Sequence, residues 1–331
     1  MYFAKSKPDC LTVVEHTLDV VEAVKALAHA YGSELSLFTS KDFELVEIAA
    51  LYHDIGKYSE TFQNMILPSI DKKWSRKNLV NYPHNYLSVC LLPFAELRKK
   101  YSKEEAEIVA LAVGYHHERD LHPDEDFILQ IYEQYLKEAI PTIKKEIPLP
   151  FELNEKASRF AVRVICNRDN KVNQFDHHMW LKYILIKGLL QRADHSASAK
   201  RKGEEVVPYV EEAVDSNVGE QTKKFLESKY ASLRPLQTLT YENQDKNIVL
   251  IAQTGSGKTE AALLWIGRKK GFITLPMRTS LNAMYDRIQS EEGIGFSSTG
   301  LLHSSALDHL MSKSEETTSF EQSIIQTEHT R

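Results

Sequence analysis

The sequence has few cysteines, and the three it has, Cys10, Cys90 and Cys166, lie far apart with no CxxC pair. This spacing excludes a disulfide framework and a zinc ribbon, and it is typical of a reducing compartment. No apolar run approaches the roughly 20 residues that a membrane-spanning helix needs. The first ten residues also lack the apolar core of a signal peptide. We therefore expect a soluble, cytoplasmic protein with no membrane partner.

A strong excess of charge of one sign is also missing. The formal net charge is −5 over 331 residues, and 42% hydrophobic with 26% charged residues fits an ordinary globular protein. The length allows roughly two domains. The lack of a gross basic excess argues only weakly against a nucleic-acid partner, because an acidic protein can carry a local basic groove.

Up to about residue 200 the pattern is mostly helical. Apolar residues recur at helical spacing in four segments, and a residue suited to capping precedes the second and third. These segments are 12–32, 39–56, 101–117 and 176–194. Residues 121–150 carry prolines and charge and are predicted to form a variable surface excursion. The sequence therefore predicts a mostly helical domain over 1–205, followed by a charged linker over 206–232.

From residue 233 the pattern changes to alternating strands and helices. Short apolar runs at 246–253, 271–276 and 298–304 are predicted strands, and 260–270 and 279–292 are predicted helices. Strands that alternate with helices in this way indicate a parallel sheet. We therefore expect an α/β domain over 233–331.

The strongest local motif is the glycine-rich segment AQTGSGKT at 252–259, between the first predicted strand and helix of this domain. Backbone N–H groups of such a turn, together with the helix N-terminus, surround phosphate oxygens. The lysine reaches the outer phosphates and the following hydroxyl holds Mg²⁺. We predict that ATP, with Mg²⁺, is bound by Thr254, Gly255, Ser256, Gly257, Lys258 and Thr259.

Two neighbouring segments resemble those of superfamily 2 helicases. The segment LPMRTSLNAMYDRI at 275–288 is similar to their nucleic-acid-contacting segment, which places Pro276 and Arg278 on nucleic acid. LRPLQ at 233–237 is similar to their adenine-reading segment, with Gln237 as the reader or, equally, as an ordinary surface glutamine. The resemblance implies a partial RecA-like domain 1 of a helicase over 233–331. The acidic Walker B box is absent, so we expect a truncated copy with negligible ATP turnover.

Histidines and aspartates stand near the ends of the helices predicted for the first domain. Each one alone is more typical of a core or boundary residue. Their order, H…HD…H…HH…D, is the pattern of the HD hydrolase superfamily. A two-metal site explains it, because two ions about 3.5–4 Å apart need a bridging carboxylate and several imidazoles. We predict that Asp54 bridges the ions, that His16, His53 and Asp194 complete one, and that His84, His116 and His117 complete the other.

Adjacent His53 and Asp54 can reach one centre only from the end of a helix, since consecutive side chains point about 100° apart. We assign that end to Gly56. Lys57 would lie beside the site, where it would neutralise a phosphate oxygen or pair with a carboxylate. Ser198 is either a contact of the site or an ordinary loop serine. The mixed imidazole and carboxylate set suits Mn, Fe, Co or Ni better than Mg.

Taken together, ALYHDIGK, RADHSASA, AQTGSGKTEAALLW and LPMRTSLNAMYDRI resemble the CRISPR-associated helicase-nuclease of type I systems. The resemblance implies that residues 1–205 form an HD nuclease domain that cuts single-stranded DNA with two divalent transition-metal ions. It also implies recruitment by an RNA-guided CRISPR surveillance complex in antiviral defence. Two alternatives stay open: an HD phosphohydrolase of small or cyclic nucleotides with a regulatory P-loop, and a non-catalytic, metal-stabilised binding module.

Overall fold

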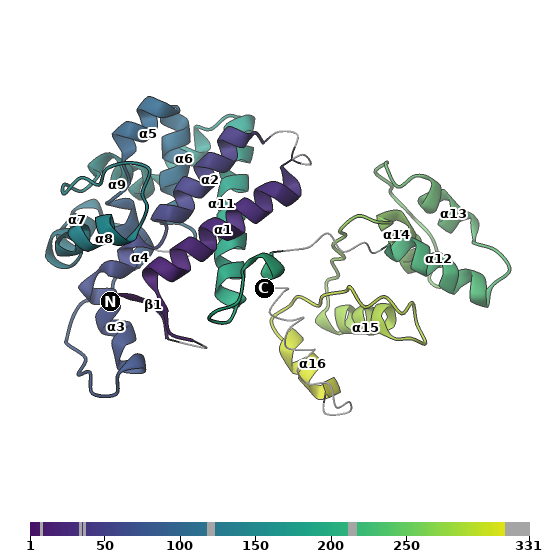
Figure 1. Ribbon diagram of the computed structural model, residues 1–331. Coiled ribbons are helices and arrows are strands. Elements are labelled where there is room, and N and C mark those ends of the chain that lie inside the picture. Colours follow the sequence, from purple (N-terminus) through teal and green to yellow (C-terminus); the bar gives the residue numbers. More distant parts are fainter. Residues whose placement is uncertain (7–8, 33–34, 36–37, 118–122, 211–216, 315–331) are drawn as a thin grey trace. The chain divides into compact units, whose positions relative to one another are not determined.

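The structure is a computed structural model that describes residues 1–6, 9–32, 35, 38–117, 123–210 and 217–314. The chain divides into two units, Met1–Glu212 and Ala213–Arg331 (Figure 1). The first unit is mostly helical, with one short antiparallel ribbon near its N-terminus. A mostly helical first domain was predicted, and this is confirmed.

The elements of the first unit are β1 (Phe3–Lys5), β2 (Leu11–Thr12), α1 (Val13–Tyr31), α2 (Ser40–Tyr52), the 3₁₀ helix η1 (Ile55–Tyr58), α3 (Glu60–Ile70), α4 (His84–Val89), α5 (Phe94–Lys100), α6 (Lys103–Gly114), α7 (Glu125–Tyr135), η2 (Lys137–Ala139), α8 (Ile140–Glu146), α9 (Arg159–Cys166), α10 (Arg168–Asn173), α11 (His177–Ala199) and η3 (Val207–Tyr209). Those of the second unit are α12 (Val218–Lys229), α13 (Pro235–Glu242), α14 (Lys258–Ile266), α15 (Arg278–Gln289) and α16 (Ala306–Ser314).

The four helices predicted before residue 200 are present as α1, α2, α6 and α11, and they pack on one another. Two of them begin at the predicted caps. At the start of α2, Thr39 N and Oγ1 both donate to Asp42 Oδ2, at 2.8 and 2.7 Å. At the start of α6, Ser102 Oγ accepts from Glu105 N at 3.0 Å. Side chains thus satisfy amides that a helix leaves unpaired at its N-terminus.

One lysine joins three of these helices. Lys182 Nζ, on α11, lies 2.8 Å from Asp42 Oδ1 and 2.9 Å from Glu105 Oε1, so it contacts the first turns of both α2 and α6. The two carboxylates also lie at helix N-termini, where the helix dipole favours negative charge. This network fixes the relative positions of helices whose opposite ends carry candidate metal ligands.

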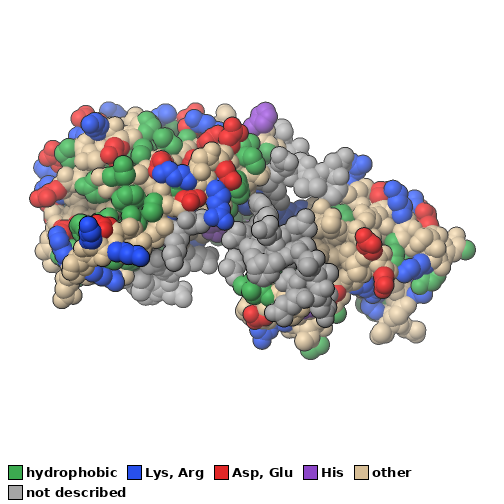
Figure 2. All heavy atoms as spheres, turned by 60° about the horizontal axis from the view of Figure 1, so that its bottom comes forward, with side chains coloured by type: hydrophobic (Ala, Val, Ile, Leu, Met, Phe, Trp, Pro, Cys, Tyr) green, Lys and Arg blue, Asp and Glu red, His purple; other side chains and the backbone are tan. Residues whose placement is uncertain are grey.

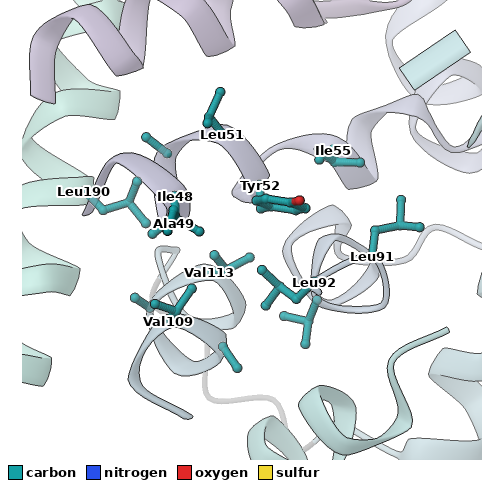
Figure 3. Packing of buried hydrophobic residues seen from close by; sticks show 14 of the residues in the cluster. Ile48, Ala49, Leu51, Tyr52, Ile55, Leu91, Leu92, Val109, Val113 and Leu190 are labelled. Atoms are coloured by element: carbon teal, nitrogen blue, oxygen red, sulfur yellow. The ribbon is translucent and has the colours of Figure 1, made fainter. Parts of the chain in front are cut away.

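A single apolar core fills the first unit. Figure 3 shows Ile48 and Ala49 of α2 over Val109 and Val113 of α6, with Leu190 of α11 on one side and Tyr52 of α2 on the other. All six side chains are buried. Dense packing of this kind resists local displacement. The core therefore holds the ends of α2 and α6 in place.

The prediction for residues 121–150 was wrong within their described part. Residues 123–150 contain α7 and α8, and Ile128, Ile131, Tyr132, Ile140 and Ile143 are buried in the main core. The apolar residues of α7 recur at helical spacing, so burial of that face outweighs the local excess of charge. Residues 121 and 122 lie outside the described residues.

The three strands predicted after residue 233 are not formed within the described part of the second unit. The segments 246–253, 271–276 and 298–304 run without strand pairing, and Val249, Ile251 and Phe272 are 92%, 94% and 82% exposed. A strand exists only where a neighbouring strand satisfies its N–H and C=O groups. The helices predicted between these segments are present as α14 and α15.

The segment 206–232, expected to be a linker, contains η3 and α12 in its described residues. Helix α12 packs against α14 within the second unit, and Val218 and Leu263 share a small apolar cluster with Ile288 and Ile294. The division between the two units falls after Glu212. The described part of the second unit therefore starts with a helix, α12, that packs against α14.

The surface mixes charges of both signs. On the face shown in Figure 2, Lys and Arg side chains are interspersed with Asp and Glu over the described residues. None of the helices in the described ranges combines the length and the apolar character needed to cross a bilayer. Because charges of both signs are mixed on the face shown in Figure 2, a basic surface suited to a polyanion would have to be a local one there.

Candidate metal centre and phosphate loop

The adjacent His53 and Asp54 lie at the end of a buried helix, as predicted, but Gly56 does not end it. Helix α2 stops at Tyr52, His53 caps it, and Asp54 leads into η1, which contains Gly56. A Cβ at Gly56 would lie 1.9 Å from the His84 carbonyl oxygen. Glycine is therefore needed here because α4 approaches the backbone closely, which a reading of helix ends could not reveal.

The other candidate ligands come from separate elements. His16 lies in the first turn of α1, His84 is the first residue of α4, and His116 and His117 follow the last residue of α6. Asp194 was expected to close the last helix, but α11 continues to Ala199. Its side chain reaches the site because α11 packs along α1.

Asp54 lies at the centre of the cluster and is 1% exposed. Its Oδ1 lies 3.1 Å from His84 Nε2 and 3.7 Å from His116 Nε2. Its Oδ2 lies 3.3 Å from the Nε2 atoms of both His16 and His53. Each oxygen of this one carboxylate thus faces a different pair of imidazoles.

The donor atoms of the candidate ligands form two groups. In each group they lie within 4.8 Å of one another; one group is Asp54, His84, His116 and His117, and the other is His16, His53 and Asp194. Donor atoms on opposite sides of one ion are about 4 Å apart, twice a metal–nitrogen distance of about 2.1 Å. Small inward movements would bring each group to one ion.

The hydrogen bonding of the histidines fits metal ligation. His53 Nδ1 donates to Ala50 O at 2.6 Å and His116 Nδ1 donates to Val113 O at 2.7 Å. A ligating histidine is typically oriented in this way, with Nε2 left for the ion. The buried Nε2 atoms of His16, His53, His84 and His116 make no hydrogen bond within the described residues, and each faces an oxygen of Asp54. Buried polar atoms without partners are costly, so this donor set fits a metal site.

Lys57 pairs with the carboxylate rather than remaining free for a phosphate. Its Nζ lies 2.6 Å from Asp54 Oδ2, and the residue is 7% exposed. Ser198 Oγ donates to Asp194 Oδ1 at 3.4 Å. These contacts favour a role in orienting carboxylates: Lys57 orients Asp54, and Ser198 orients Asp194.

Burial and the two aspartates shift the pKa values of the cluster in opposite directions. Burial lowers the pKa of His84 to about 4 and that of His117 to about 3, so both rings are neutral, as ligands must be. Burial also acts to lower the pKa of His53, but the Asp54 carboxylate outweighs it and raises that pKa. Burial opposes ionisation of Asp54, but the positive charges of His53 and Lys57 outweigh it and hold the pKa of Asp54 well below its usual range.

The low pKa values of His84 and His117 predict acid sensitivity of the metal-free protein. Between the ordinary histidine pKa of 6.5 and about 4, the unfolded chain takes up protons that these two folded residues do not. Their stabilisation is therefore present above about pH 6.5 and is lost as the pH falls toward 4. We expect the Tm of EDTA-treated protein to fall across this window, less so in His84→Gln. A Tm that falls as steeply in His84→Gln as in the unaltered protein would contradict the neutral imidazole of His84.

The predicted phosphate loop has a backbone that only glycine adopts readily. Gly255 and Gly257 have φ values of 78° and 88°, and α14 begins directly after the second of them. Lys258 Nζ donates to the carbonyl oxygens of Ala252 and Gln253, at 2.8 and 2.7 Å, so the lysine closes the loop on itself. The loop lines a cavity of about 740 Å³, within the range of small-molecule sites.

Gln237 is not the surface residue that one reading expected. It is 3% exposed, its Oε1 accepts from Arg234 N at 2.9 Å, and its side-chain amide packs against Gly257. Thr254 and Thr259 line the same cavity, and Ser256 Oγ is buried without a partner. Pro276 and Arg278 are exposed, and Arg278 donates to Ser304 Oγ at 3.0 Å. A nucleic-acid role for these two stays a prediction.

Three supporting residues went unnoticed in the sequence. Ser88 Oγ accepts from Gly56 N at 2.8 Å and donates to His84 O at 3.0 Å. Asn85 donates to the carbonyl of Gly114, and Gln191 Nε2 donates to His116 O at 2.7 Å. They fix the turns that carry His84 and His116. Each bonds a backbone group of a distant segment, which the spacing within its own helix does not reveal.

Comparison with known proteins finds a domain match within the first unit and similar curated proteins. The HD domain model matches residues 13–169, which include all candidate ligands except Asp194. The chain is 23% identical to the CRISPR-associated nuclease/helicase Cas3 of Methanothermobacter thermautotrophicus, covering 88% of this chain and 40% of the relative. It is 26% identical to a putative CRISPR-associated nuclease/helicase Cas3 of Methanocaldococcus jannaschii, covering 73% and 38%.

The chain thus spans about two fifths of the length of these curated relatives. Among solved structures, the CRISPR-associated Cas3 HD domain protein of Methanocaldococcus jannaschii matches with a TM-score of 0.37 and 22% identity, covering 58% of this chain and 97% of that one. The chain therefore carries an HD domain and is a homologue of the CRISPR-associated Cas3 nuclease/helicase proteins.

Proposed function

We propose that this protein is a metal-dependent nuclease that cuts single-stranded DNA in CRISPR antiviral defence, with an ATP-binding helicase-type domain joined to it. The observation that carries the proposal is the buried cluster in which the two oxygens of Asp54 face two separate pairs of imidazoles. The names of the curated relatives supply the CRISPR context. A role in the cytoplasm, beside an RNA-guided surveillance complex, is part of the proposal.

Two divalent ions, held by the two groups of ligands, would supply Lewis-acid activation of water and would neutralise charge on a phosphodiester. The protein supplies their placement. Asp54 belongs to one group by its Oδ1 and faces His16 and His53 of the other by its Oδ2, so it would bridge them. Lys57 fixes the orientation of this carboxylate. The imidazole-rich donor set favours Mn, Fe, Co or Ni over Mg.

A basic segment that precedes His84 in the sequence favours a polyanionic substrate. Residues 72–77, KKWSRK, contain four cations and no acid, are all exposed, and lead toward His84 at the start of α4. Lys77 is paired with Glu60 at 2.6 Å, which leaves three cations for solvent or ligand. Trp74, 39% exposed, offers a face on which a base can stack, and single-stranded nucleic acid is bound by this combination of cations and aromatics.

For the second unit we propose a partial RecA-like domain over 233–331 that binds ATP, with α12 packed against it. The glycine conformations at Gly255 and Gly257, the position of Lys258 at the start of α14 and the cavity beside the loop support nucleotide binding. The buried Gln237, against Gly257, supports its assignment to the adenine-reading segment.

The function is tested by substrate choice. Protein stripped with EDTA and reloaded with Mn²⁺, Co²⁺ or Ni²⁺ is expected to degrade circular and linear single-stranded DNA without ATP, and to bind about two ions per chain. Duplex DNA, cyclic dinucleotides and deoxynucleoside triphosphates are the comparison substrates. Hydrolysis of the free nucleotides with no cutting of DNA would favour the phosphohydrolase instead. Bound metal with no hydrolysis at all would favour the binding module.

The two units are expected to act separately in this assay. Lys258→Ala should abolish binding of a fluorescent ATP analogue, because it removes the lysine that reaches the outer phosphates. It should leave ATP-independent DNA cutting within about twofold of the unaltered protein, the metal ligands being in the first unit. Lys224→Ala, an exposed lysine of α12 outside the loop cavity, is the matched control. Loss of cutting in Lys258→Ala alone, with folding intact, would contradict the separation.

A further inference from the structure

Lys5, at the end of strand β1, lies beside the metal cluster although nothing in its sequence context marks it. Its Nζ donates to the carbonyl oxygen of Ser198, on α11, at 3.0 Å. The side chain of the same serine donates to Asp194, one of the candidate ligands. The ammonium group therefore lies at the edge of the group formed by His16, His53 and Asp194.

The strand that carries Lys5 is held firmly in this position. Phe3 N donates to Gln63 Oε1 at 3.1 Å, and Gln63 Nε2 donates back to Phe3 O at 2.9 Å. The same Nε2 donates to Lys57 O at 2.7 Å. One buried amide thus joins β1 to the segment that carries Lys57, so the two lysines have fixed positions at the same cluster.

The two lysines differ in their charge partners. Lys57 is neutralised by Asp54 at 2.6 Å. Lys200, a buried lysine directly after α11, is paired with Asp19 at 2.9 Å. Lys5 has one carbonyl acceptor, and none of the ion pairs found in the described ranges involves it. It is a partly buried cation that makes no direct ion pair with a carboxylate of the described residues.

The environment of Lys5 is consistent with a missing anion. Burial lowers its pKa to about 8, and the positive charge of Lys57 acts in the same direction, while Asp194, Asp54 and Asp19 act to raise it. The amine stays mostly protonated at neutral pH, and an arriving anion would stabilise that form. A compact ammonium with two unused N–H donors suits a phosphate oxygen.

We propose that Lys5 binds a non-bridging oxygen of the DNA backbone at the metal cluster, as a cation of the site that forms no direct ion pair within the described residues. This inference rests on the proposed nuclease function. Lys5 would then be a substrate-binding residue, distinct from Lys57, which orients the carboxylate of Asp54. Phosphate contacts of this kind do not depend on base sequence.

The test compares Lys5→Gln with Lys5→Arg and with Lys25→Gln, an exposed lysine of α1. Binding of fluorescein-labelled dT10 is measured by anisotropy in EDTA over a range of salt, and steady-state cleavage is measured with Mn²⁺. Lys5→Gln is expected to weaken binding and raise KM about ten- to a hundredfold, the range for a charged hydrogen bond. The slope of log affinity against log salt should fall by about 0.7, the value for one phosphate contact on a single strand.

Lys5→Arg should keep the salt slope, and Lys25→Gln should behave as the unaltered protein. Metal content and Tm are measured for each variant, and Lys5→Met, which keeps the aliphatic stem, replaces Lys5→Gln if that variant is unstable. Cutting and binding in Lys5→Gln or Lys5→Met equal to those of Lys25→Gln would overturn the inference. An unaltered protein that neither binds nor cuts single-stranded DNA would instead refute the nuclease function itself.

Discussion

Replacing Asp54 with asparagine is expected to abolish DNA cutting and to remove most of the bound metal. The asparagine is nearly isosteric, but it lacks the charge that both pairs of imidazoles face through Oδ1 and Oδ2. Loss of a shared carboxylate should therefore affect both ions at once. The fall in activity should exceed the roughly 10–100-fold that follows loss of a residue that only orients a ligand.

The same substitution has a structural cost that must be separated from the chemical one. It leaves Lys57, 7% exposed, without its partner, and breaking a buried ion pair from one side typically costs about 3–5 kcal/mol. Asp54→Asn/Lys57→Met removes the orphaned charge, so it should recover much of the lost Tm. It should recover neither metal nor cutting.

Metal content, circular dichroism and cleavage of single-stranded DNA are the measurements, and Asp126→Asn, at an exposed aspartate of α7, is the matched control. Retention of two ions per chain in a folded Asp54→Asn protein would show that this carboxylate does not bridge them. The double variant distinguishes that result from simple unfolding, because its stability no longer depends on the lost pair.

The candidate ligands were predictable because their chemistry fixes their residue types and their order. Five segments of one chain carry, in order, H, HD, H, HH and D. Few structural explanations other than a shared metal site account for all five together. The N-termini of α2 and α6 could be predicted from Thr39 with Asp42 and from Ser102 with Glu105, since capping is local. Local rules thus placed most of the helices that carry the ligands.

The features that were missed depend on contacts between distant segments. Gly56 was read as a helix end, yet its role is the close approach of α4, which begins 28 residues later. Lys5 is 193 residues from Ser198 in the chain. Residues 246–253 have the composition of a strand, but a strand needs a partner that no local pattern supplies. Spacing within one element cannot predict these features.

The second large effect is expected from Gly56→Ala. The added Cβ would lie 1.9 Å from His84 O, 2.8 Å from His84 C and 2.9 Å from Ser88 N. All three are backbone atoms, so no rotamer change relieves the contact, and α4 must move away from η1. Overpacking typically costs about 1–3 kcal/mol or more. Each kcal/mol lowers Tm by about 2–4 °C in a domain of this size.

The displacement should also reach the chemistry, because His84 is the first residue of α4 and faces Asp54 Oδ1 at 3.1 Å. Gly188→Ala is the matched control: that glycine is exposed in the interior of α11, and an added Cβ meets nothing within 4 Å. Since alanine is favoured over glycine in a helix by up to about 1 kcal/mol, its Tm should rise slightly and its activity should not change. Equal Tm and metal content in the two variants would mean that the close packing of α4 on η1 does not position the ligand.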